Sequence, residues 1–255
     1  MASTSKCGNT ESLLRSRVED ALCLAQRRCI PSFLGFLDAT EQQLARQFLA
    51  CTDADRFTFW GGYDDAERCI LGCFPEYMTA DVDEFPLQRI TFRYRAQRSL
   101  SHRDVLGTLM SQGIKREAVG DILCADGLVV VFLRDEIAPY ICEQITKIGG
   151  VGVRIELHSS EPLPQVHRYE SMQDTIASPR LDAVVKVLLS TSREKAAQMI
   201  ASGSVSVNHL LCDEVSETVS PDTVISVRGY GRFVVDRIGP PTKKGRLRLE
   251  ARKCL

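Results

Sequence analysis

The stretch SREKAAQMIASGSVSVN, residues 192–208, predicts a short helix that runs directly into a strand. Ser192 is a typical N-cap residue, and Gly203 is typical of the position just after a helix end. The alternation of Ser and Val that follows predicts the strand. Arg193 and Lys195 lie in the first helical turn, where unpaired backbone N–H groups and the helix dipole also attract anions. This corner is therefore suited to binding phosphate.

The sequence on either side completes a small module. RLDAVVKVLL, residues 180–189, predicts a preceding helix with its apolar residues on one side. DTVISVRGYGRFVVDRIG, residues 222–239, predicts a strand, a Gly-Tyr-Gly turn and a second strand. The basic, alternating tail at 243–253 is expected to add an edge strand. We place this module at residues 179–255.

The middle of the chain predicts a second domain, over residues 87–158. Its segments are expected to be strand, helix, strand, strand, helix and strand, beginning with the alternating QRITFRYR at 88–95. That order is the ferredoxin-like plan, which RNA recognition modules also use. The aromatic signature of those modules is absent, since Phe132 is the only aromatic residue on the third strand.

The remaining segments predict an N-terminal region and a linker. Residues 1–86 contain two expected helices, at 11–30 and 36–50, and an expected hairpin around Gly61-Gly62. Residues 159–178 are polar, contain prolines and show no periodicity, so they are expected to be a linker. The predicted fold class is therefore α+β, with an N-terminal helical and β region, a ferredoxin-like domain and a C-terminal module.

Charge is distributed unevenly along the chain. The net charge is −1, yet residues 180–255 have 13 Lys and Arg against 8 Asp and Glu, which leaves the first 179 residues acidic. Such asymmetry is expected when one domain binds a polyanion. No apolar run is long enough to span a membrane and no secretory signal is seen, so a cytoplasmic location is expected. The ten cysteines fit no zinc template, and we expect free thiols, no metal and no cofactor.

The C-terminal pattern resembles the S-four RNA-binding domain, named after a protein of the small ribosomal subunit. The resemblance rests on Arg180-Leu181-Asp182, Ser192-Arg193, the helix to Gly203, Val205 to Asn208, and Ile225 to Arg228. It implies that structured RNA is held by the two helices and the following turn. The RNA contacts that the resemblance implies are Arg180, Lys186, Ser192, Arg193, Lys195, Gln198, Asn208 and Arg228. Arg232 is added to this set because it flanks the Gly-Tyr-Gly turn together with Arg228.

Three further stretches resemble the YlmH family: FWGGYDDAER, SHRDVLGTLMSQGIKREAVGDIL and KIGGVGVRIE. The family couples an S-four domain to an α/β domain of RNA-binding type. The resemblance implies a non-catalytic protein that binds ribosomal RNA of the large subunit and peptidyl-tRNA in ribosome-associated quality control. We expect it to be a monomer when it is not on the ribosome.

Several alternatives stay open at the level of sequence. A second RNA surface is expected in the middle domain, at Arg93, Arg95, His102, Arg103, Lys115 and Arg116, unless nearby acids pair with these side chains. The protein could instead be an RNA-modifying enzyme, because RLD also opens the catalytic stretch of pseudouridine synthases. The residues after Asp182 do not continue that motif, and Asp182 is expected to orient Arg180 or to cap its helix. A scaffold role for the acidic part is a third possibility.

Overall fold

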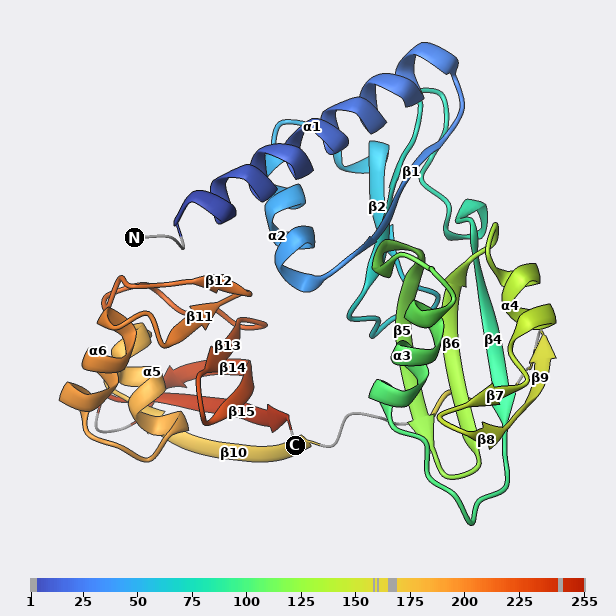
Figure 1. Cartoon of the computed structure of the whole chain (residues 1–255). Helices are drawn as coiled ribbons and strands as arrows, with labels where there is room; N and C mark the ends of the chain where they lie inside the picture. The colour runs from blue at the N-terminus through green and yellow to red at the C-terminus, as the bar shows by residue number, and fades with distance from the viewer. Residues whose placement is uncertain (1–3, 158, 160, 165–168, 243–244, 255) are drawn as a thin grey trace. The chain divides into compact units, whose positions relative to one another are not determined.

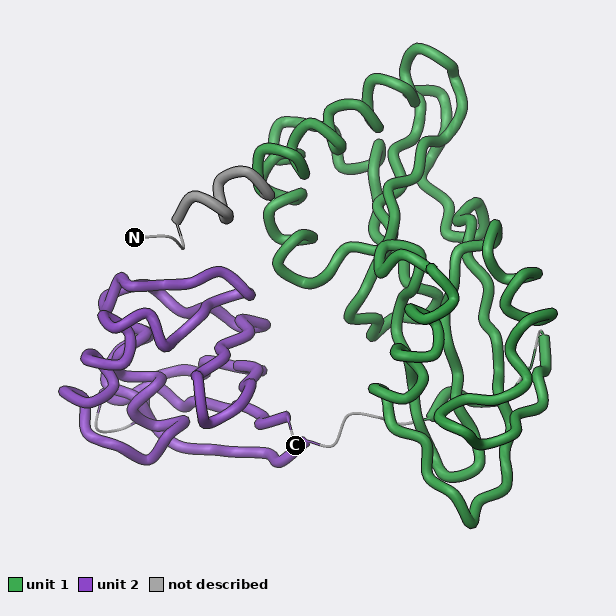
Figure 2. The backbone as a smooth tube through the Cα atoms, viewed as in Figure 1, with its two compact units in different colours: residues 1–166 green, residues 167–255 purple. Residues whose placement is uncertain are grey.

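The computed structural model describes residues 4–157, 159, 161–164, 169–242 and 245–254, with the backbone alone for 4–10. It divides into two compact units, Met1–Val166 and His167–Leu255 (Figure 2). Each unit has its own hydrophobic core. The expected boundary between residues 86 and 87 lies inside the first unit.

The first unit begins with a helical layer on a small sheet (Figure 1). Its elements are α1 (Thr4–Arg28), β1 (Ser32–Leu37), α2 (Ala39–Phe48), η1 (Ala54–Arg56), β2 (Phe57–Trp60), β3 (Cys69–Cys73) and η2 (Val82–Glu84). The antiparallel sheet has the order β1-β3-β2. The two helices cover one face of this sheet. Leu34 and Leu71 on that face pack against Leu14 and Val18 of α1 and against Ala45 of α2.

Two expectations for this region need correction. Residues 32–37 form a strand, whereas 36–50 were expected to be helical throughout; the helix begins at Ala39, after the N-cap Asp38. The two predicted hairpin strands are confirmed as β2 and β3, but they are joined by residues 61–68 and not by a tight Gly-Gly turn.

The ferredoxin-like prediction is confirmed. Its elements are β4 (Leu87–Arg93), α3 (His102–Ser111), η3 (Arg116–Ala118), β5 (Val119–Ala125), β6 (Leu128–Arg134), α4 (Ala138–Gln144), β7 (Lys147–Ile148), β8 (Val151–Gly152) and β9 (Arg154–Leu157). The main sheet has the order β5-β6-β4-β9 with antiparallel neighbours. Ser101 caps α3 as expected, in a capping box with Asp104.

Both faces of this sheet are covered, which the alternation in β4 did not predict. On β6, Val129 and Val131 pack in the cluster that includes Val105 and Ile141 of the two helices. Their neighbours Val130 and Phe132 pack in a second cluster with Phe36 of β1. The unit is therefore a four-layer stack of helices, small sheet, main sheet and helices.

This stacking removes the surface that an RNA recognition module uses. Phe132 is only 2% exposed, and its ring stacks on Tyr63 with 5.2 Å between ring centroids. A Cβ at Gly62 would lie 2.4 Å from the Phe132 ring, so the chain passes directly over it. Base stacking on this face is excluded in the folded unit.

The second unit is an antiparallel sheet with two helices. Its elements are β10 (Tyr169–Ile176), α5 (Leu181–Leu188), α6 (Arg193–Ala201), β11 (Val205–Val207), β12 (Leu210–Leu211), β13 (Val224–Val227), β14 (Gly231–Pro241) and β15 (Leu247–Cys254). The strand order is β10-β15-β14-β13-β11-β12. The two helices pack on this sheet through Val184, Val185 and Ile200.

Two expectations change here as well. The expected linker at 159–178 contains β10, which pairs with β15 along eight residues. The basic tail forms β15, which lies between β10 and β14 and is not an edge strand. Among the described residues, no helix is long and apolar enough to cross a membrane.

Candidate nucleic-acid interface

The N-terminal ends of α5 and α6 meet at one carboxylate. Asp182, in the first turn of α5, is 4% exposed. Its Oδ1 accepts hydrogen bonds from the backbone N–H of Ala183, at 2.9 Å, and from Nε of Arg180, at 3.2 Å. Its Oδ2 accepts from Nε of Arg193, at 2.7 Å. The expected orienting role toward Arg180 is present, and it extends to an arginine on the other helix.

These contacts fix the charge states of the cluster. Burial alone would raise the pKa of Asp182, but hydrogen bonds from Arg193 and Arg180 outweigh burial and leave that pKa below its usual value. The same hydrogen bond raises the pKa of Arg193. The cluster is one anion and two cations at neutral pH, with a net charge of +1. A buried, paired carboxylate offers no accessible nucleophile, so the geometry does not support catalysis by Asp182.

The first turn of α6 is an exposed, charged corner. Ser192 is the N-cap, and its Oγ accepts from the backbone N–H of Lys195 at 3.2 Å. The hydroxyl thus already satisfies one open donor of the helix start. Lys195 and Gln198 are exposed as expected, as is Lys186 on α5. Glu194 is also exposed in this turn and offsets one positive charge.

The strand side of the unit gives its predicted residues different roles. Asn208 has a φ of +47°, and its Oδ1 accepts from the backbone N–H of Val224 at 3.0 Å. It therefore supports the turn between β11 and β12. Arg228 is exposed and lies two residues before Tyr230, an aromatic residue at 41% exposure that was not among the predicted contacts. Arg232 is half-buried on β14.

The second predicted RNA surface is only partly available. Arg93 lies between Glu156 and Glu161, with Nε and Nη2 at 2.7 and 2.6 Å from their carboxylates. The Nη1 of Arg116 donates to the backbone carbonyls of Val119 and Gly120. These two arginines therefore have structural partners.

The other four residues of that surface remain exposed: Arg95, His102, Arg103 and Lys115. Partial burial and then the nearby Arg116 lower the pKa of His102, so this imidazole is neutral at pH 7. It adds no cation. Three exposed cations are left from the six residues predicted.

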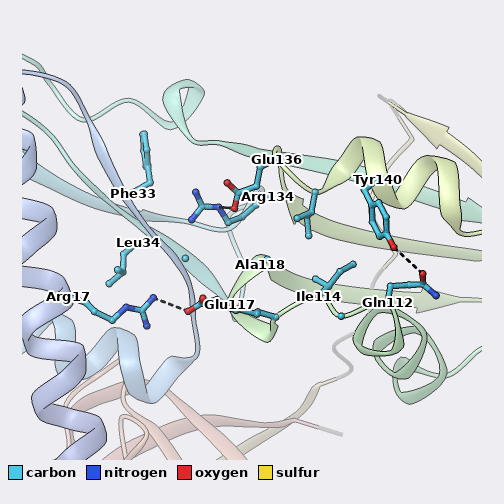
Figure 3. A pocket seen from close by; sticks show the side chains of 14 residues that line it. Arg17, Phe33, Leu34, Gln112, Ile114, Glu117, Ala118, Arg134, Glu136 and Tyr140 are labelled. Carbon is cyan, nitrogen blue, oxygen red and sulfur yellow. Dashed lines mark hydrogen bonds and ion pairs between the residues drawn. The ribbon is translucent and has the colours of Figure 1, made fainter.

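Lys115 lines a hollow of about 490 Å³ among α1, β1, the end of α3 and α4. Four of its other charged side chains, labelled in Figure 3, form two ion pairs: Arg17 contacts Glu117 at 3.0 Å, and Arg134 contacts Glu136 at 3.2 Å. Apolar side chains, Phe33, Leu34 and Ile114 among them, also line it. The hollow is not a strongly positive groove of the kind that follows an RNA backbone.

Taken together, these features describe a ferredoxin-like domain and a small two-helix module with an exposed cationic corner. Residues 81–161 match the family model YlmH_RBD, whose description is "Putative RNA-binding domain in YlmH", and residues 179–225 match the S4 domain model, so the chain is of an RNA-binding class. The chain is 35% identical over 217 residues to a Bacillus subtilis protein named "Ribosome-associated protein quality control protein P2", with 84% of each chain covered. It belongs to the YlmH family.

A solved structure named "Cell division protein ylmH from Streptococcus pneumoniae" is 20% identical in sequence, with a TM-score of 0.47. That match covers 62% of this chain and 93% of the other.

Proposed function

We propose that this protein is a non-catalytic RNA-binding factor that binds ribosomal RNA of the large subunit and peptidyl-tRNA in ribosome-associated quality control. It acts in the cytoplasm and is a monomer away from the ribosome. The observation that carries the proposal is the exposed corner at the start of α6, where Arg193 shares Asp182 with Arg180, the N-cap residue of α5, and Lys195 lies in the same helical turn as Arg193. The name of the Bacillus subtilis relative supports the ribosomal setting.

Electrostatics predicts how this binding responds to salt. Five of the predicted contacts in the S4 module are cationic, at least partly exposed and outside the strands: Arg180, Lys186, Arg193, Lys195 and Arg228; Arg232 is half-buried on β14. Each neutralised phosphate contributes roughly 0.7 to 0.9 to the slope of log affinity against log salt. If all five contact RNA, that slope is roughly −3.5 to −4.5. Structured RNA is read mainly by shape, so base substitutions in helical regions should change the affinity little.

The direct test is sedimentation of cell lysate through a sucrose gradient, followed by detection of the protein in each ribosomal fraction. We expect it with free large subunits, and crosslinking should join it to tRNA there. A variant with both Arg193→Ala and Lys195→Ala should leave this fraction. Because Arg193→Ala also takes a partner from the buried carboxylate of Asp182, the variant is compared with wild type at a temperature where both chains are folded. Wild-type sedimentation of the double variant would count against the proposal.

The RNA-modifying alternative has its own test. Large-subunit ribosomal RNA incubated with the protein should show no new modified base by mass spectrometry. A pseudouridine or a methylated base formed only in the presence of the protein would replace the proposal with the enzymatic one.

A further inference from the structure

The S4 module contains a buried charge in an otherwise apolar helical turn. Asp182 is flanked in α5 by Leu181, Ala183, Val184 and Val185, all of which are buried. Burying a carboxylate is costly, and replacing a buried ion pair with apolar residues is often neutral or stabilising. A carboxylate at this position therefore calls for a role beyond packing.

The two carboxylate oxygens of Asp182 accept hydrogen bonds from different donors. Oδ1 receives Arg180 and the Ala183 amide, and Oδ2 receives Arg193. Both arginines are held through Nε, and 43% and 52% of their side-chain surfaces stay exposed. A hydrogen bond to Nε fixes the plane of the guanidinium and leaves its terminal N–H groups available. Those groups can donate two parallel hydrogen bonds to phosphate oxygens.

We infer that Asp182 is a positioning residue of the RNA interface: it locks Arg180 and Arg193, from two different helices, into one preformed clamp for neighbouring phosphates of an RNA backbone. The order of the two side chains is established before RNA arrives, so binding does not have to immobilise them. This inference rests on the proposed function, since it concerns the same RNA contact.

If Asp182 positions the arginines, removing its charge should lower RNA affinity, whereas net charge alone predicts the opposite change. Removing a carboxylate adds one unit of positive charge, which by itself should tighten RNA binding. In Asp182→Asn one carboxylate oxygen becomes an NH₂ group. If it replaces Oδ2 it meets the Nε–H of Arg193, and if it replaces Oδ1 it meets the Nε–H of Arg180. At least one arginine is released in either orientation.

The experiment measures binding of the full chain to large ribosomal subunits purified from the cells that make the protein. We expect Asp182→Asn to weaken binding by about two- to tenfold if one arginine loses its order, and by up to about 100-fold if both do, because each released side chain must then be ordered on binding. The matched control is Glu194→Gln, which removes an exposed carboxylate beside Arg193 and should leave affinity unchanged or raise it a few-fold.

A double-mutant cycle separates positioning from a merely structural role. Arg193→Ala should cost much less in the Asp182→Asn background than in wild type, because its guanidinium has already lost its order. Additive losses, or wild-type affinity for Asp182→Asn, overturn the inference. If wild type itself does not bind the subunit, the proposed function fails together with the inference.

Arg193→Lys tests the same idea without touching a buried position. It keeps the charge but loses the Nε–H that Oδ2 accepts, and it should lose nearly as much affinity as Arg193→Ala. If Asp182→Asn is too unstable for binding measurements, this variant decides, and wild-type affinity for Arg193→Lys overturns the inference.

Discussion

Phe132→Ala tests whether the main sheet of the first unit is a buried layer or an RNA-binding face. The side chain is 2% exposed, stacks on Tyr63 and lies in the cluster that joins the two sheets. Truncating a buried phenylalanine lowers the free energy of unfolding by about 3–5 kcal/mol. For a unit of this size, each kcal/mol corresponds to about 2–4 °C, so its melting temperature should fall by about 6–20 °C.

Two measurements separate the alternatives. Calorimetry should show the first unit melting earlier while the second keeps its transition, and Phe233→Ala, equally buried in the other core, should give the reverse result. At a temperature where the Phe132→Ala chain is folded, its RNA affinity should equal that of wild type. A base stacked on an exposed Phe132 would instead contribute about 1–3 kcal/mol to binding. A stability change below about 1 kcal/mol, or a tenfold loss of RNA affinity in the folded variant, would refute the four-layer arrangement.

Three further outcomes follow from contacts in the first unit. Gly62→Ala should lower the free energy of unfolding by about 2 kcal/mol or more, because Gly62 has a φ of +100° and an added Cβ would press on the Phe132 ring. Gly113→Ala is the milder control, since Gly113 also has a positive φ but has open space around it; equal losses from the two substitutions would contradict this reasoning. Asp121→Asn should cost about 1–3 kcal/mol in urea unfolding, since its carboxylate accepts from the Tyr63 hydroxyl and from two backbone N–H groups of the 61–68 connection; an unchanged midpoint would contradict it. Burial raises the pKa of the Cys73 thiol to about 12, so at pH 8 the thiol stays protonated and should react with a thiol reagent only in denaturant. If Cys73 in the native chain is labelled as rapidly as an exposed thiol such as Cys51, its burial is contradicted.

The elements that were predictable from sequence are those with local signals. The ferredoxin-like order could be predicted because its strands alternate and its helices have capping and turn residues, such as Ser101 before α3 and Gly127 between β5 and β6. Strand β1 was missed because SFLGFL is a continuous apolar run, buried on both sides, and such a run has no period that separates strand from helix. Strand β10 was missed for the opposite reason. Most of its side chains are exposed, and it is a strand because its backbone pairs with β15, about 80 residues further along the chain.

In the candidate interface, too, local features were predictable from sequence and tertiary contacts were not. The spacing of Ser192, Arg193 and Lys195 predicted an exposed cationic corner, because capping and helical periodicity are local. The pairing of Arg193 with Asp182 was not predictable, since it joins two helices across a turn whose geometry the sequence does not give. Arg93 was misjudged because its partners Glu156 and Glu161 come from a strand more than 60 residues away and from the segment after it. For charged residues, composition identifies candidates, but tertiary pairing decides which of them stay available.

Local pairing also explains how a chain with a net charge of −1 can bind RNA. At physiological ionic strength a charge acts over about 8 Å, so the acidic residues of the first unit that lie farther away contribute little to the field at the S4 module. Near the α6 corner, Asp182 is buried between two arginines, Glu194 is an exposed acid in the first turn of the helix, and Glu214 is close enough to Arg180 for that cation to help lower its pKa. The local field is the balance between these acids and the cations Arg180, Arg193 and Lys195. Net charge describes solubility and long-range steering, whereas affinity for phosphate depends on these few side chains and on how rigidly they are held.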